Sequence, residues 1–350
     1  MREPLPTREP AEQGHRARPA GRSRPAPLAV AGQVRAYLEL GKAGLATFVV
    51  LTTLVGLLVG GRGATSWSIL LATLAGTAMT SSGSLALNQW IEHERDARMR
   101  RTARRPLPTG RLTPRHAFWV ATASVVLGLA LLAWRVNILT AALDLIVVLL
   151  YLLAYTPLKT RTPFCTLVGA ICGAIPPMMG WSAATGSLGV GAYILGATLF
   201  LWQIPHFLAL AWLYREDYER GGFRMLPAID STGRLTAQLA LLYTLALIPI
   251  GIAATLSGMA GHAYLLGSLA LGLAMLLLGL RLLLRRTERN ARMLFFASLI
   301  YLPVLLGLLV ADRGPTPDRY MPVGLVEAPA AASGEAGSPG NSVPASPSAP

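Results

Sequence analysis

Long apolar segments, separated by short polar stretches, make up most of this chain. Nine of them are long enough to cross a membrane, at roughly 43–60, 66–88, 116–134, 137–155, 164–184, 190–213, 236–257, 262–284 and 293–311. Only 14% of the residues are charged, against about 25% in a typical soluble domain. Since lipid cannot satisfy an open sheet edge, such runs predict helices. The sequence therefore predicts an all-α polytopic membrane protein with nine transmembrane helices.

The basic residues predict the orientation of these helices. Most of the 31 Lys and Arg residues lie before residue 43 or in the loops that share its side of the membrane. The opposite side holds only Arg62, Arg135, Arg313 and Arg319. Because basic loops stay in the cytoplasm, we expect a cytoplasmic N-terminus and an external C-terminus. Topology also explains the net charge of +14, so we expect no nucleic-acid partner.

Two stretches outside the apolar segments differ in composition from the rest. Residues 1–33 are rich in Pro, Arg, Ala and Gly, and residues 312–350 in Pro, Ala, Ser and Gly. We expect both to be disordered tails around a membrane domain at 34–311. Acidic residues and many prolines make the first tail a poor transit peptide. We therefore expect a bacterial inner membrane, with the mitochondrial inner membrane as the alternative.

A first polar cluster follows the second apolar segment. Asn88, Glu92 and Asp96 are spaced at i, i+4 and i+8, which places them on one face of a helix. A dense run of arginines follows, including Arg101 and Arg105. Mg²⁺ favours a few carboxylates together with substrate phosphate, and arginine favours phosphate oxygens. The cluster predicts a Mg²⁺–diphosphate site; a solvated helix end with Glu–Arg pairs is the alternative.

Two further clusters lie toward the same predicted side, one at the end of the fourth span and one within the sixth. In the second, Tyr155 and Lys159 flank a proline, with Arg161 close behind; Lys159 can reach a phosphate, or the group can be an ordinary membrane-interface anchor. In the third, Gln203 and His206 lie inside a predicted span. Polar groups at that depth usually face a cavity, although a membrane histidine can also bond a neighbouring helix.

Carboxylates outside the first cluster supply two more candidates. Asp217, with Arg215 beside it, follows the third cluster and would be the carboxylate of a second metal site. Asp144 lies in the middle of the fourth span, and we assign it no role. The concentration of polar groups in three loops on one side predicts a polar cavity that opens toward the cytoplasm.

Together these motifs resemble the UbiA superfamily of intramembrane prenyltransferases over roughly residues 35–311. The shared motif is Asn88-x-x-x-Glu92-x-x-x-Asp96, with the arginines behind it. The runs 205–207 (Pro-His-Phe) and 225–227 (Met-Leu-Pro) are similar to the branch that farnesylates heme. The chain departs from the family where Glu92 replaces an Asp and where 41–44 (Gly-Lys-Ala-Gly) replaces Thr-Lys-Pro-Arg.

The resemblance implies a nine-helix bundle around a cavity that opens to the cytoplasmic side. It implies Mg²⁺-dependent transfer of farnesyl from farnesyl diphosphate to a vinyl group of heme b, with addition of water, giving heme O and diphosphate. Heme b is then a substrate, and a heme A synthase would be a candidate recipient of the product. The implied metal ligands are Asn88, Glu92, Asp96 and, for a second ion, Asp217. The implied substrate-binding and catalytic groups are Arg101, Arg105, Tyr155, Lys159, Arg161, Gln203, His206 and Arg215, with His206 as a ligand of the heme iron or a positioning group.

Two other functions stay open at this point. One is a prenyltransferase with an aromatic or quinone-precursor acceptor, which would carry a second Asp-rich motif where this chain has only Asp217. The other is a transporter of an anionic metabolite. Transporters of that kind often have inverted repeats and binding groups at the midplane, and neither pattern is visible here.

Overall fold

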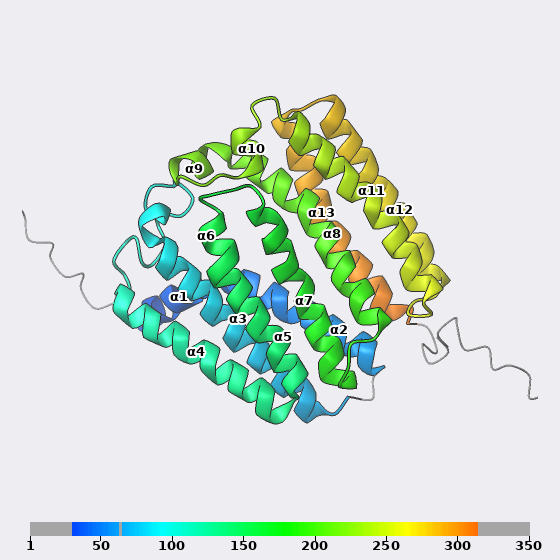
Figure 1. Ribbon diagram of the computed structural model, residues 1–350, viewed down its shortest axis with the longest axis horizontal. Helices are drawn as coiled ribbons and strands as arrows, with labels where there is room; N and C mark the ends of the chain where they lie inside the picture. The colour runs from blue at the N-terminus through cyan, green and yellow to red at the C-terminus, as the bar shows by residue number, and fades with distance from the viewer. Residues whose placement is uncertain (1–29, 63–64, 314–350) are drawn as a thin grey trace, which may run out of the picture.

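The computed structural model describes residues 30–62 and 65–313 (Figure 1). Nine helical spans in this part of the chain are long and apolar enough to cross a membrane. They are α2 (Ala43–Gly61), α3 (Trp67–Asp96), α4 (Pro114–Arg135), Ile138–Leu158, α7 (Cys165–Thr185), α8 (Val190–Leu213), α11 (Arg234–Leu256), α12 (His262–Leu284) and α13 (Glu288–Ala311). The predicted fold class and number of spans are confirmed.

The fourth span is composite. It consists of α5 (Ile138–Leu149), a π-helical stretch η1 (Leu150–Tyr155) and a last turn α6 (Thr156–Leu158). The hydroxyl of Thr156 donates to the carbonyl of Tyr151, five residues earlier, at 2.7 Å. Short π segments inside α-helices are frequent at functional sites, and this one ends on a residue of the second predicted cluster.

The centre of the bundle is formed by α7 and α8, whose spanning windows are 61% and 67% buried. Helix α2 packs on α7 through two glycines. A Cβ atom at Gly180 would lie 1.8 Å from the carbonyl oxygen of Thr53, and one at Gly56 would lie 1.9 Å from that of Pro177. Close approach through small residues is a common way for helices to associate in lipid, where the hydrophobic effect offers little.

A short helix, α1 (Val30–Leu40), precedes the first span and was not predicted. It buries Ala36 and Leu40 against Ala86 of α3 and Ala117 of α4. Its first four residues belong to the stretch expected to be a tail; the remainder of that tail, 1–29, lies outside the described residues. Of the second expected tail only residues 312–313 are described.

Two short helices, α9 (Arg215–Arg220) and α10 (Leu226–Ile229), lie at the same end of the bundle as the loop after α3 (Figure 1). The carboxylate of Asp217 accepts hydrogen bonds from the backbone N–H groups of Arg100 and Arg101, at 3.4 and 3.2 Å. The backbone N–H of Arg224 donates to the carbonyl of Lys159 at 2.7 Å. The three loops that hold the predicted polar clusters therefore meet at one end.

Candidate active site

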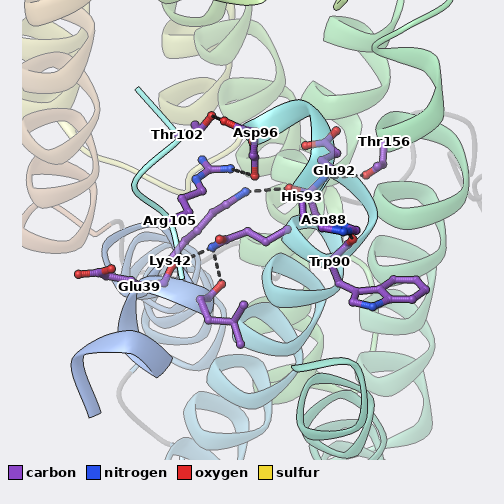
Figure 2. A network of polar contacts seen from close by, with 12 residues as sticks. Glu39, Lys42, Asn88, Trp90, Glu92, His93, Asp96, Thr102, Arg105 and Thr156 are labelled. Carbon is purple, nitrogen blue, oxygen red and sulfur yellow. Dashed lines mark hydrogen bonds and ion pairs between the residues drawn. The ribbon is translucent and has the colours of Figure 1, made fainter. Parts of the chain in front are cut away.

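The end of α3 carries the first predicted cluster, as Figure 2 shows. Helix α3 continues for eight residues past the predicted end of its span, to Asp96, so the three side chains follow one regular helical face. Asn88, Glu92 and Asp96 are 0%, 4% and 1% exposed. This is a buried polar face, so the solvated helix end considered above does not describe it.

Each of these three side chains is bonded to a cation from another part of the chain. The pairs are Lys42 Nζ to Asn88 Oδ1 at 2.8 Å, Lys159 Nζ to Glu92 Oε1 at 2.8 Å and Oε2 at 3.0 Å, and Arg105 Nη1 to Asp96 Oδ2 at 2.6 Å. A buried charge is tolerated when it is paired and hydrogen-bonded. The cluster is therefore a compact group of three cations and two carboxylates around one amide.

Lys42 reaches this cluster from an unusual backbone conformation just before α2. Its φ of 47° and ψ of 56° are left-handed, a region that non-glycine residues seldom adopt. Burial, together with the neighbouring cations Arg105 and Lys159, lowers the pKa of Lys42 to about 7. Three cationic side chains thus face two carboxylates, and the lowered pKa of Lys42 reflects burial and repulsion from the other two cations, which a bound anion would offset.

Aromatic rings line the passage from this cluster into the bundle. The rings of Tyr151 and Tyr155 stack with centroids 5.3 Å apart, and Lys159 Nζ lies 4.6 Å from the Tyr155 centroid. The hydroxyl of Thr156 accepts a hydrogen bond from the amide of Asn88 at 3.1 Å. The π-helical stretch thus holds both rings, and Thr156, which follows it directly in α6, is a partner of the α3 cluster.

An apolar cavity of about 180 Å³ lies below the cluster. Ser84 and Leu85, one turn below Asn88 on α3, line its upper part together with Tyr155. Walls from α2, α7 and α8 complete it, and Gln203 is one of the few polar groups that face it. A polar cluster above a narrow apolar cavity suits a molecule with a charged head and a hydrocarbon tail.

Two of the predicted groups, Arg101 and Asp217, have packing roles in the cap of the site, which is formed by the loop after α3 and by α9. The guanidinium of Arg101 lies over the rings of Tyr214 and Tyr218, with distances of 5.1 and 5.9 Å to their centroids. Asp217 is held by the N–H groups described above. Among the described residues, no three His, Cys, Asp or Glu side chains gather as a metal site, so Asp217 does not join Glu92 and Asp96 in this arrangement.

His206 faces away from the cavity, although it lies in a span as predicted. Its Nδ1 is 2.8 Å from the hydroxyl of Ser298 on α13, and its ring stacks between Trp202 and Phe295 at centroid distances of 5.1 and 5.0 Å. The described residues that line the cavity include Gln203 and Phe207 but not His206. The geometry favours the interhelical role for His206 over that of a heme ligand.

Two predicted substrate-binding arginines lie apart from the cluster. Arg215 pairs with Glu288 at the start of α13, at 3.5 Å. Arg161 is exposed in the loop before α7. Neither contacts the three side chains of α3 in the structure.

The α3 cluster fits a magnesium ion by its donor chemistry. All of its candidate ligands are oxygens, which is what Mg²⁺ prefers. The Oδ1 atom of Asp96 is buried and has no hydrogen-bond partner among the described residues. An unpaired buried acceptor beside a second carboxylate is the local feature that a cation would satisfy.

Sequence reasoning missed Thr156 and Gln89, whereas Lys42 was a candidate from its place just before the first span. Lys42 and Thr156 bond Asn88 from positions 46 and 68 residues away along the chain. Gln89 donates to the carbonyls of Glu39 and Leu40, at 2.8 and 2.7 Å, and so fixes α1 to α3. The signal available for Lys42 was its place in the family's basic motif; nothing in the sequence pattern singled out Thr156 or Gln89.

The chain was also compared with known proteins. The model of the UbiA prenyltransferase family matches residues 49–300. The protoheme IX farnesyltransferase of Solibacter usitatus is 43% identical over 289 residues, covering 80% of this chain and 99% of the relative. The mitochondrial protoheme IX farnesyltransferase of Arabidopsis thaliana is 42% identical, covering 83% of this chain and 68% of the relative.

Solved structures with the same fold include two prenyltransferase-related proteins. Digeranylgeranylglyceryl phosphate synthase superposes with a TM-score of 0.70 at 16% identity, covering 80% of this chain and 98% of that one. A UbiA homologue from Archaeoglobus fulgidus, bound to GPP and Mg²⁺, superposes with a TM-score of 0.56 at 15% identity, covering 79% and 99%. At these identities the superpositions show a shared fold. From the family match and the close relatives, the chain belongs to the UbiA prenyltransferase family.

Proposed function

We propose that this protein transfers the farnesyl group of farnesyl diphosphate to a vinyl group of heme b, with addition of water, to give heme O and diphosphate. The observation that carries the proposal is the buried cluster of Lys42, Lys159 and Arg105 with two carboxylates, directly above an apolar cavity inside a membrane bundle. The names of the two relatives described above, both protoheme IX farnesyltransferases, support this choice of donor and acceptor.

The polar cluster would bind the diphosphate and assist its departure. Lys159 and Arg105 can turn from their carboxylates toward phosphate oxygens, which accept such cations well. Asn88, Glu92 and Asp96 would hold Mg²⁺, which offsets the negative charge that builds on a departing diphosphate. Cations placed where that charge develops lower the barrier to breaking the carbon–oxygen bond.

The cavity would hold the hydrocarbon chain and keep water from the allylic carbon. When the carbon–oxygen bond breaks, its electron pair leaves with the diphosphate, and the vinyl group supplies the electrons of the new carbon–carbon bond. Water then adds to the porphyrin side chain and loses a proton. The stacked rings of Tyr151 and Tyr155 present faces that attract positive charge at the mouth of the cavity.

Other site groups enter the proposal in supporting roles. Arg101 and Asp217 hold the cap above the cluster, and a contribution of Asp217 to a second metal ion stays a prediction. Gln203 would contact the substrate from the cavity wall. We place the protein in a bacterial inner membrane with a cytoplasmic N-terminus, so that the cluster faces the cytoplasm, where the positive-inside rule puts its basic loops.

A product assay tests this proposal. Membranes containing the protein are given heme b, farnesyl diphosphate and Mg²⁺, and the extracted hemes are separated by chromatography with mass detection. We expect a heme heavier by one farnesyl group plus water, its loss with chelator, and its recovery when Mg²⁺ is restored.

Variants link the product to the site. Glu92→Gln and Asp96→Asn should lose most of the activity. Glu94→Gln is the matched control, because Glu94 is exposed on the same helix and away from the cluster. Recovery of unmodified heme b from the folded protein in a lipid bilayer would show that heme b is not the acceptor. Aromatic acids and quinone precursors would then be offered as acceptors.

A further inference from the structure

Asp144 is a buried carboxyl group for which the proposed reaction has no use. It lies within the fourth membrane span and is 4% exposed. Its Oδ2 atom has no hydrogen-bond partner among the described residues, and the nearby hydroxyl of Thr80 on α3 lies 3.1 Å from the carbonyl oxygens of both Gly76 and Thr77, to which it donates within its own helix. Asp144 also lines the apolar cavity. Polar groups at such a depth are costly and are usually kept for a function.

The position of Asp144 defines the lower end of the cavity. Asp144 lies eleven residues before Tyr155, which would correspond to about 16 Å along a regular α-helix and to slightly less here, because residues 150–155 are π-helical. Met179 of α7 lines the cavity too, and it belongs to a packed apolar cluster with Leu132 and Leu143. Asp144 is the first residue of the fourth span to line the cavity and Tyr155 is the last, so along this span the cavity extends from the tyrosines to Asp144.

This depth matches a particular length of isoprenoid chain. With carbon–carbon bonds near 1.5 Å, each isoprene unit of an extended chain advances about 5 Å. Three units therefore span about 15 Å and four units about 20 Å. A chain of fifteen carbons that starts at the mouth would end near Asp144, and a chain of twenty carbons would have to pass it.

The cavity's size favours such a slender occupant over a porphyrin. Its volume is about 180 Å³, below the range of roughly 300–1,000 Å³ that is usual for compact, drug-sized ligands. The tail of the donor is the narrow apolar part of the proposed substrate pair, so the cavity is assigned to the tail.

We infer that Asp144 is the floor of the prenyl-chain site and limits the donor to fifteen carbons. A hydrocarbon end pressed against Asp144 would remove any water that solvates its unpaired oxygen, and an unsolvated polar group is unfavourable. The inference rests on the proposed function, because it assumes that the tail of a prenyl diphosphate enters this cavity. Asp144 is here a specificity-determining residue, not a catalytic one.

The test compares two donors on the same enzyme preparations. The ratio of kcat/KM for geranylgeranyl diphosphate to that for farnesyl diphosphate is measured with heme b as acceptor, which makes the result independent of the amount of folded protein. The wild-type protein should favour the shorter donor at least tenfold. Asp144→Val, similar in size but apolar, should raise the ratio at least tenfold, whereas Asp144→Asn should leave it near the wild-type value.

Leu143→Ala is the control, because Leu143 is buried on the same helix in a packed apolar cluster and is not among the residues that line the cavity. Its ratio should stay at the wild-type value even if the protein becomes less stable. If the valine variant does not fold, Asp144→Ala is a second variant that removes the carboxyl group from the end of the cavity. An unchanged ratio in the apolar variants, an equal change in Leu143→Ala, or equal use of both donors by the wild-type protein would overturn the inference.

A failure of the proposed function gives a different result. If the wild-type protein does not farnesylate heme b, heme b is not its acceptor, and the preference between the two donors has to be measured by binding, without an acceptor. Competition of geranylgeranyl diphosphate against labelled farnesyl diphosphate for the purified protein in Mg²⁺ then reports the chain-length preference directly. The same tenfold change in relative affinity is expected for Asp144→Val.

Discussion

The bond between Lys159 and Glu92 offers a direct test of how the site is held together before substrate binds. Lys159 Nζ donates to both carboxylate oxygens of Glu92, at 2.8 and 3.0 Å. The two side chains are only 10% and 5% exposed. Little water can replace a lost partner at this depth, so removing one charge leaves the other uncompensated.

The expected magnitudes follow from this burial. Lys159→Met leaves the Glu92 carboxylate without its cation and should lower the free energy of unfolding by about 3–5 kcal/mol. Glu92→Gln keeps an oxygen that can accept from Lys159, so its effect should be smaller, about 1–3 kcal/mol. In the double variant neither charge is left alone, and the loss should be at least about 2 kcal/mol less than the sum of the single losses.

The assay is a double-mutant cycle on the purified protein in mixed micelles, without Mg²⁺ or diphosphate. Unfolding is followed by denaturant titration, and the same preparations are tested for heme O formation. The double variant should regain stability but no turnover, because the proposed reaction uses both groups, whereas stability requires only that neither charge is left unpaired. Single losses that add to within about 0.5 kcal/mol would refute the reasoning, since they would show that the two groups do not interact.

Three further changes test other parts of the structure. Gly180→Ala should cost about 1–3 kcal/mol in the same unfolding assay, because a Cβ there would lie 1.8 Å from a carbonyl oxygen of α2, whereas Gly307→Ala, whose Cβ would meet nothing within 4 Å, should have little effect. Burial raises the pKa of Asp230, but hydrogen bonds from the first turn of α11 outweigh it and hold this pKa below its usual value. The ionised carboxylate should therefore stabilise the protein above about pH 4 and lose this effect as the pH falls further. Asp230→Asn should remove this loss of stability at acid pH in unfolding curves taken across pH. His206→Phe should lower stability as Ser298→Ala does, and heme O formation and the absorption spectrum of bound heme should persist; loss of that spectrum with normal stability would restore the heme-ligand role.

The spans could be predicted because lipid imposes one requirement on every residue of a span. Hydropathy located all nine segments, and the described helices match them to within a few residues at most ends. The large difference is at α3, which continues to Asp96 because Glu and Arg residues end an apolar segment without ending a helix. That continuation is what gives the α3 cluster its regular spacing.

The partners of the cluster could not be predicted, because they depend on which helices become neighbours. Lys159 was expected to contact phosphate, and its bond to Glu92 joins residues 67 positions apart. Depth in the membrane correctly indicated that His206 has a partner, but depth cannot say whether that partner is a substrate or Ser298. Helix α1 was missed because its 11 residues are too few to cross a membrane and lie outside the spans, where hydropathy carries little information.

The charges of the site explain why it can remain folded both with and without its ligands. Lys42, Lys159 and Arg105 face the carboxylates of Glu92 and Asp96, so the buried cluster carries one positive charge in excess when all three cations are protonated. Adding a divalent cation together with a diphosphate ester changes the total by about one negative charge, because the ester carries roughly three at neutral pH. In the proposed complex the cations would turn from the carboxylates to phosphate, and Glu92 and Asp96 would hold the metal. A buried site of low dielectric tolerates such an exchange because its net charge stays near zero throughout, whereas either ligand alone would leave it strongly charged.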